Sequence, residues 1–141
     1  MIVLLLSDCH LDKTKRIKSS ASIKDSISKL YIRAKKEPLK KARAALFTAI
    51  ELSNTIENDS LYFKSLNKLA ILEYQNKKYQ QFQKYSHQLI KDARRRKDTL
   101  YQAKGFFNLG TYYRRISKID SSYYFFNEAK LYYQTLKDSA K

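Results

Sequence analysis

The sequence is poor in the residues that interrupt regular structure. Its 141 residues include two glycines, one proline and no tryptophan. Because β-hairpins and sandwiches need frequent glycine and proline turns, this scarcity excludes a turn-rich β protein and predicts an all-α chain. The length allows one domain at most, and a hydrophobic content of 43% is enough for a core.

Residues with reactive or metal-binding side chains are equally scarce. Cys9 is the single cysteine, which excludes an intramolecular disulfide and a cysteine-based zinc site. Neither His10 nor His87 has a second ligand three or four positions away. Gly105 and Gly110 fall inside one predicted helix and form no phosphate-binding loop. The sequence therefore predicts a chain that is not an enzyme, with no catalytic residue, metal site or cofactor.

Acidic residues are few beside the basic ones. The chain has 29 lysines and arginines against 13 acidic residues, a net charge of +16. This balance favours acidic partners, such as nucleic acid, anionic lipid or carboxylate-rich peptides. A simpler interpretation is that lysines coat the solvent-facing sides of helices, because the basic residues are spread from Lys13 to Lys141. The densest cluster, residues 91–97, is expected in the last turns of a helix, where cations offset the helix dipole.

A long hydrophobic run is also missing. Residues 1–6 are apolar, but this run is too short to span a membrane and lacks the basic start of a signal peptide. It is interpreted as a truncated export signal or as an incidental apolar start. Residues 6–9 also resemble a bacterial lipoprotein cleavage site, with Cys9 as the lipidated residue, although Asp8 replaces the small residue of that pattern. A truncated signal predicts an exported, periplasmic or membrane-associated protein, and otherwise the chain is expected in the cytoplasm.

What the sequence does contain is a repeat with a period of about 40 residues, in the range typical of stacked-repeat proteins. A short polar phrase recurs at residues 58–61, 97–100 and 137–140. Between these phrases, apolar residues at helical spacing predict three αα-hairpins, at about residues 21–57, 60–97 and 99–137. Residues 1–20 are expected to form a short apolar start and a basic linker ahead of a repeat domain covering 21–141.

The expected helix boundaries follow from capping residues and the proline. The first helix should stop before Pro38, which suits the first turn of the second. Side-chain oxygens at the starts of the third, fifth and sixth helices are expected to cap them: Asp59 or Ser60, Asp98 or Thr99, and Asp120 or Ser121. By the same rule Asp138 and Ser139 predict the cap of a further helix, so the domain is expected to continue beyond residue 141.

The third hairpin has the most specific local pattern of the chain: Phe106, Leu109, Gly110 and Tyr113, followed by Ser122, Phe126 and Ala129. This pattern resembles a tetratricopeptide repeat. The second hairpin matches less well, with Leu66, Leu69 and Ala70 in place but Tyr74 one position late. The period also exceeds the one usual in this family, which is about 34 residues. HEAT and armadillo arrays have a longer period that matches better, but they lack the Leu-Gly-x-x-Tyr signature.

The resemblance implies a fold and a biological setting. It implies a right-handed superhelical stack of about three αα-hairpins, an α-solenoid, in which Gly110 lets the paired helix approach closely. The chain further resembles the amino-terminal repeat segments of transcriptional regulators or sensor kinases from Bacteroidetes-type bacteria. Linkage to an output domain in a longer protein is then expected.

The family's groove also implies candidate binding residues. In that family, first-helix residues line a concave groove that receives a peptide or partner helix. The corresponding residues here are Lys64, Asn67, Ile71, Tyr74, Lys104, Phe107, Thr111, Arg114 and Arg115. Cations, an amide and aromatic rings suit an extended acidic peptide. The alternative is an ordinary solvated face, or one covered by a further repeat.

One specialised groove of the family is not expected. Its clamp for acidic chaperone tails needs a set of lysines and asparagines across three repeats. Lys104 and Asn108 fall on two of those positions, but Asn67 and Ile71 replace the lysine and asparagine expected one repeat earlier. The sequence therefore predicts a non-catalytic protein-interaction or scaffold module without this clamp. A nucleic-acid-binding basic repeat is the alternative, which is weaker because the aromatic residues fall mostly at helix-packing positions.

Overall fold

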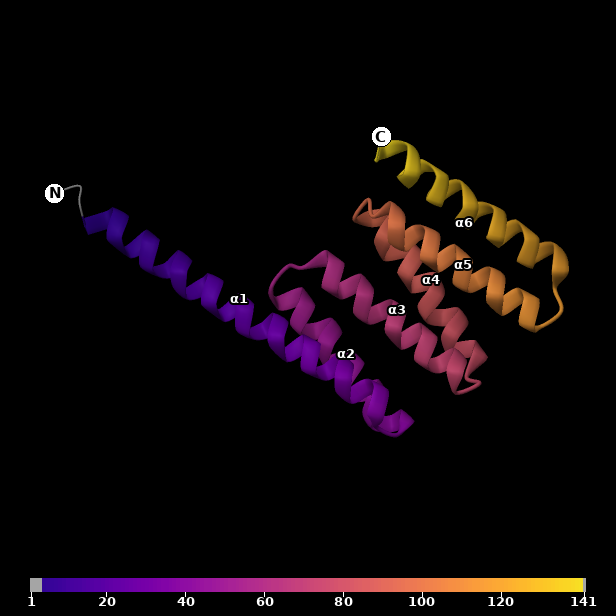
Figure 1. Cartoon of the computed structure of the whole chain (residues 1–141), viewed down its shortest axis with the longest axis horizontal. Coiled ribbons are helices and arrows are strands. Elements are labelled where there is room, and N and C mark those ends of the chain that lie inside the picture. Colours follow the sequence, from indigo (N-terminus) through magenta and orange to yellow (C-terminus); the bar gives the residue numbers. More distant parts are fainter. Residues whose placement is uncertain (1–3, 141) are drawn as a thin grey trace.

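The part of the chain that the structure describes consists of six helices packed one after another. The computed structural model describes residues 4–140, and side chains from residue 19 onward. The helices are α1 (Leu4–Lys36), α2 (Leu39–Thr55), α3 (Asp59–Gln75), α4 (Tyr79–Arg95), α5 (Thr99–Arg115) and α6 (Ile119–Ser139). Each helix packs against the next, so the fold is all-α and consists of three αα-hairpins (Figure 1). The predicted fold class and hairpin number are confirmed.

The repeat has a stricter spacing than the sequence indicated. The first residues of α2 to α6 are evenly spaced along the chain: Leu39, Asp59, Tyr79, Thr99 and Ile119. Four of these helices, α2 to α5, have 17 residues each. The period seen in the sequence is therefore one hairpin of two equal helices. Residues separated by one full period, such as Asp59 and Thr99, occupy equivalent positions in successive hairpins.

The four turns after α2, α3, α4 and α5 are built alike. In each, one residue that is not glycine adopts a left-handed backbone, with φ of 50° at Glu57, 58° at Lys77, 57° at Lys97 and 59° at Ser117. The amide of the following residue bonds the carbonyl five positions back, as Asn58 N does to Ser53 O at 2.9 Å. This pattern is the Schellman motif, which satisfies the free carbonyls at a helix end. It explains how a chain with two glycines forms four tight reversals.

Side-chain caps begin α3 and α5. Oδ1 of Asn58 accepts from the Leu61 amide at 2.9 Å, and Oδ1 of Asp98 accepts from the Tyr101 amide at 2.9 Å. The predicted cap at Asp98 is confirmed. The predicted cap of α3 at Asp59 or Ser60 is wrong, because Asn58 takes that role and Asp59 begins the helix. Asn58 and Asp98 are equivalent in successive hairpins. The polar phrase that begins at Asn58 therefore aligns with Asp98 and not with Lys97.

The boundaries of α6 also differ from the prediction. Lys118 precedes the helix and provides no side-chain cap, so neither Asp120 nor Ser121 caps α6. Residues 138 and 139 lie inside the last turn of α6, where the Ser139 hydroxyl donates to the Thr135 carbonyl at 2.8 Å. In the described structure Asp138 and Ser139 therefore cap no helix.

The first helix is much longer than predicted. The basic linker expected within residues 1–20, at residues 10–20, is instead part of α1, which has 33 residues and runs through it without a break. Figure 1 shows the amino-terminal half of α1 projecting away from the other helices. A projecting segment has no neighbour to pack against and needs no apolar stripe, which explains why residues 10–20 show no helical periodicity. The predicted stop before Pro38 is confirmed, since α1 ends at Lys36. Pro38 sits one position ahead of α2.

Small residues bring the helices together around two apolar clusters. One cluster centres on Phe63, Leu66 and Leu89, and the other on Phe106 and Leu109. A Cβ at Gly105 would lie 2.5 Å from Cγ1 of Ile90 in α4, and one at Gly110 would lie 2.7 Å from the ring of Phe126 in α6. Both distances are too short for a methyl group. The expected close approach at Gly110 is therefore confirmed, and Gly105 does the same for α4.

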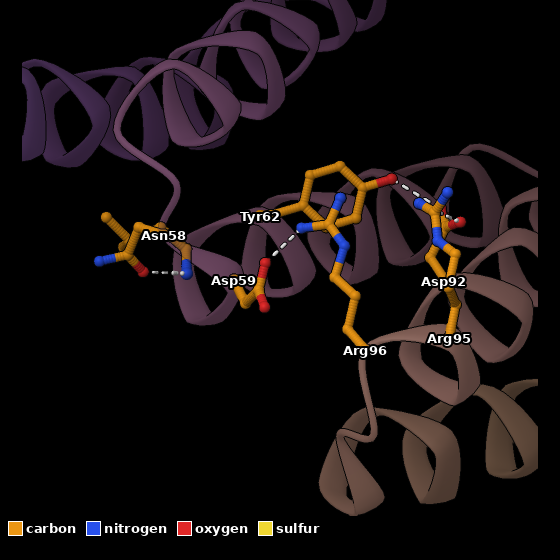
Figure 2. A network of polar contacts seen from close by, with 7 residues as sticks. Asn58, Asp59, Tyr62, Asp92, Arg95 and Arg96 are labelled. Carbon is orange, nitrogen blue, oxygen red and sulfur yellow. Dashed lines mark hydrogen bonds and ion pairs between the residues drawn. The ribbon is translucent and has the colours of Figure 1, made fainter.

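Part of the basic cluster at residues 91–97 has a structural role. Figure 2 shows Arg96, just after α4, reaching Asp59 at the start of α3, and the two form an ion pair. The Arg96 guanidinium also lies 4.2 Å from the centroid of the Tyr62 ring. Asp92, which is buried, accepts from the Tyr62 hydroxyl at 2.7 Å and from Arg95 at 3.3 Å (Figure 2). These contacts join α3 to α4.

Candidate functional site

Six of the nine predicted groove residues line one cavity. It has a volume of about 320 Å³ and lies where α3 and α5 face each other, with walls from α4 and α6. Its predicted members are Asn67, Ile71, Tyr74, Lys104, Phe107 and Thr111. We call this cavity the α3–α5 groove. The hairpin repeat explains it, because the same faces of α3 and α5 are brought side by side.

The most buried residues of the α3–α5 groove are Phe82 and Asn108, and large apolar side chains are exposed around them. Nδ2 of Asn108 donates to Oδ1 of Asn67 at 3.0 Å, which links α5 to α3. Around this pair, Phe107 is 50% exposed, and Ile71 and Tyr133 are each 39% exposed. Large apolar side chains left open around a cavity are typical of a surface that receives an apolar group.

Arg114 and Arg115 lie at one end of this groove. They line an adjoining cavity of about 400 Å³ together with Tyr74 and Thr111, which both cavities share. Nε of Arg115 donates to the Tyr79 hydroxyl at 3.1 Å, and the Arg114 guanidinium lies 5.5 Å from the centroid of the Phe126 ring. Neither arginine forms an ion pair with a carboxylate of residues 19–140. Both charges are therefore open to an acidic ligand.

Lys64 is placed apart from the other predicted residues. Its ammonium nitrogen lies 5.4 Å from the centroid of the Tyr31 ring, on the side of α3 that faces α1. Lys104, its equivalent in the next hairpin, lines the α3–α5 groove, and its ammonium lies 4.5 Å from the centroid of the Tyr101 ring. The structure therefore groups eight of the nine predicted residues along α3 and α5 and leaves Lys64 outside.

Three further residues line the α3–α5 groove. They are Phe82, Asn108 and Tyr133. Asn108 could have been found from the sequence, because it falls on a position that matches the family's clamp. Phe82 and Tyr133 come from second helices, where the spacing assigned them to the core. Their contribution depends on how α4 and α6 lean on α3 and α5, which periodicity alone does not specify.

The remaining predictions concern lipidation of Cys9, metal binding and membrane spans. Cys9 lies in the part of α1 whose side chains fall outside the described residues, so its lipidation stays a prediction. No group of three or more histidine, cysteine or acidic side chains in the described residues is arranged to hold a metal ion. Within residues 4–140, none of the helices combines the length and the apolar character that a bilayer span needs.

Comparison with known proteins identifies no relative of this chain. No family model matches the chain, and neither curated proteins nor solved structures give a match. The class that the structure itself defines is an all-α, helical-repeat-like fold with an open groove between α3 and α5.

Proposed function

We propose that the chain is a non-catalytic interaction module of the tetratricopeptide type, which binds an acidic peptide or partner segment in the α3–α5 groove. The observation that carries this proposal is the ring of exposed apolar side chains between cations. Ile71, Phe107 and Tyr133 surround the cavity, Lys104 lines it, and Arg114 and Arg115 lie at its end.

The repeat register supports the tetratricopeptide type. Leu66, Leu69 and Ala70 of α3 are equivalent to Phe106, Leu109 and Gly110 of α5, so the signature recurs without a shift. At the last position of the signature, α3 has Glu73 where α5 has Tyr113. Tyr74, one position later, lies in the lining of the groove, where it was also a predicted member. The long period comes from the length of the helices and from the three-residue turns that join them.

The chemistry of the groove favours an acidic ligand with one apolar side chain. Burying a leucine or phenylalanine side chain contributes about 1.5–3 kcal/mol. A charge-assisted hydrogen bond from lysine or arginine to a carboxylate contributes about 1.5–3 kcal/mol. By its resemblance, we further propose that the module is the sensory or scaffolding segment of a larger bacterial regulator.

Charge reversal on both sides of the groove tests this function. Peptides selected from a random display library against the wild-type protein should be rich in Asp and Glu around an apolar residue. The double variant Lys104→Glu/Arg115→Glu should bind the selected peptide about 100-fold more weakly by fluorescence anisotropy, because two attractions become repulsions. The matched control is Lys84→Glu/Lys91→Glu, on exposed positions of α4, which should keep wild-type affinity.

Two results would count against the groove. Unchanged affinity in Lys104→Glu/Arg115→Glu would place the ligand elsewhere. Equal losses in both double variants would mean that net charge alone drives binding. Random single-stranded oligonucleotides test the alternative, that the chain binds nucleic acid. If it does, its affinity for them should fall steeply between about 50 and 200 mM salt.

A further inference from the structure

A second basic feature lies between α1 and α3. Lys64 and Lys68 are one helical turn apart on α3, and their ammonium nitrogens lie 5.4 Å and 5.2 Å from the centroid of the same ring, that of Tyr31. Lys35 follows Tyr31 by one turn on α1. We call Lys35, Lys64 and Lys68 the lysine cluster.

Tyr31 holds α1 against α3 at this place. Its hydroxyl lies 2.9 Å from Oγ of Ser65, and Ser65 in turn donates to the Leu61 carbonyl at 2.8 Å. The Tyr31 ring is therefore anchored by hydrogen bonds to α3. Lys64 and Lys68 consequently lie around a fixed ring, and Lys35 is close enough to Lys68 for their charges to interact.

The three charges of the lysine cluster are not neutralised by the described protein. None of these lysines forms an ion pair with a carboxylate of residues 19–140. Burial lowers the pKa of Lys68, and the positive charges of Lys35 and Lys64 lower it further. Like charges one helical turn apart, such as Lys64 and Lys68, repel each other and destabilise a helix. The cluster therefore weakens the free protein slightly.

A cavity opens beside the cluster. It has a volume of about 500 Å³, and its polar lining residues include Lys35, Lys68, Gln75 and Asn76, while Lys64 lies just outside the lining. Glu37 contributes a carboxylate to the lining, but it lies 3.7 Å from the Lys41 ammonium. Cationic and amide donors around a hollow of this size match the needs of an oxyanion.

The third hairpin provides an internal comparison. Lys104 and Asn108 are equivalent to Lys64 and Lys68, and there the second position is neutral and is satisfied by its bond to Asn67. The repeat therefore accommodates an uncharged residue at this position. A lysine at position 68 is not required by the fold.

We propose that the crevice between α1 and α3 binds a multivalent oxyanion through the lysine cluster. The ligand class is a phosphate or polycarboxylate group, either as a small free anion or as part of an acidic chain. Binding relieves the repulsion among the three lysines and provides acceptors for their protons. The site does not depend on the α3–α5 groove, although Ile71 lines both cavities.

Isothermal titration with two probes tests this site. The probes are inorganic pyrophosphate, as a small oxyanion, and a hexaglutamate peptide, as an acidic chain, both at constant ionic strength. Wild-type protein should bind at least one of them saturably, and the stronger probe identifies the source. Lys68→Gln should weaken that binding about tenfold or more, through the loss of one charge-assisted contact. Lys35→Gln, at an exposed position, should weaken it in the same direction and guards against misfolding of the first variant.

Matched variants separate this site from general charge and from the groove. Lys91→Gln removes the same charge from an exposed position of α4 and should leave the affinity unchanged. Lys104→Glu should also leave it unchanged, so loss of groove binding and loss of oxyanion binding are distinguishable. The proposal is overturned if neither probe binds saturably, or if Lys91→Gln weakens binding as much as Lys68→Gln does.

Discussion

At the scale of single residues, the most unusual feature is a fully buried carboxylate. Glu73 has no exposed surface, and both of its oxygens accept from Arg43 of α2, at 2.6 Å and 2.8 Å. One hairpin later the same two positions carry Gln83 and Tyr113, whose polar atoms lie 3.5 Å apart. The charged pair therefore links α2 to α3, and the neutral pair links α4 to α5 at the equivalent positions.

Removing one member of the charged pair should be costly. Arg43→Ala leaves the Glu73 carboxylate buried without its partner, and we expect it to reduce the free energy of unfolding by about 3 kcal/mol. The double variant Arg43→Gln/Glu73→Tyr, which copies the neutral pair, should recover part of that loss. Urea denaturation followed by circular dichroism measures both. Equal stability of Arg43→Ala and the wild type would show that the ion pair contributes nothing.

At the scale of helices and turns, the left-handed residue in each turn is a point of strain. A non-glycine residue in this conformation is less stable than glycine by about 1 kcal/mol. Lys77 is exposed and has φ of 58°, so Lys77→Gly should raise the free energy of unfolding by about 0.5–1 kcal/mol. Thermal and urea denaturation should both show the gain.

An exposed lysine inside a helix is the control for this effect. Lys91→Gly, in α4, should lower stability by about 1 kcal/mol, because glycine is a poor helix former. A loss in both variants would mean that the backbone at position 77 is not strained.

The same turns show which elements the sequence could predict. Apolar periodicity correctly indicated six helices in three hairpins, since burial needs a stripe such as Leu66 and Leu69 of α3. The turn residues could not be recognised, because Glu57, Lys77 and Lys97 have no preference for left-handed backbone. Their position within the repeat selects them, and not their chemistry.

The groove was predictable to a similar degree, through the resemblance to a family. The groove positions of the tetratricopeptide family, carried onto one face of α3 and α5, gave Asn67, Ile71, Lys104 and Phe107. They did not give Phe82, because its place depends on the packing of α4 against its neighbours.

At the scale of the whole molecule, tyrosines that are wholly or partly shielded from solvent couple the fold to alkaline pH. Burial raises the pKa of five of them, which lie on α1, α3, α4, α5 and α6: Tyr31, Tyr62, Tyr85, Tyr101 and Tyr133. A raised pKa means that folding favours the protonated phenol. This stabilisation is complete below the unfolded pKa, about 10, and is lost as the pH rises through the folded pKa values.

Tyr101 offers the clearest test of this coupling. Its pKa is raised first by burial and then by the negative charge of Asp98. Because phenylalanine keeps the ring and removes the ionisable hydroxyl, Tyr101→Phe should lose less stability than the wild type between about pH 9 and pH 11. Urea denaturation across this range gives the difference, in which the titration of the many lysines cancels. Tyr123→Phe, at a position 71% exposed, should follow the wild-type profile. Parallel profiles for Tyr101→Phe and the wild type would show that burial of this phenol does not link the fold to pH.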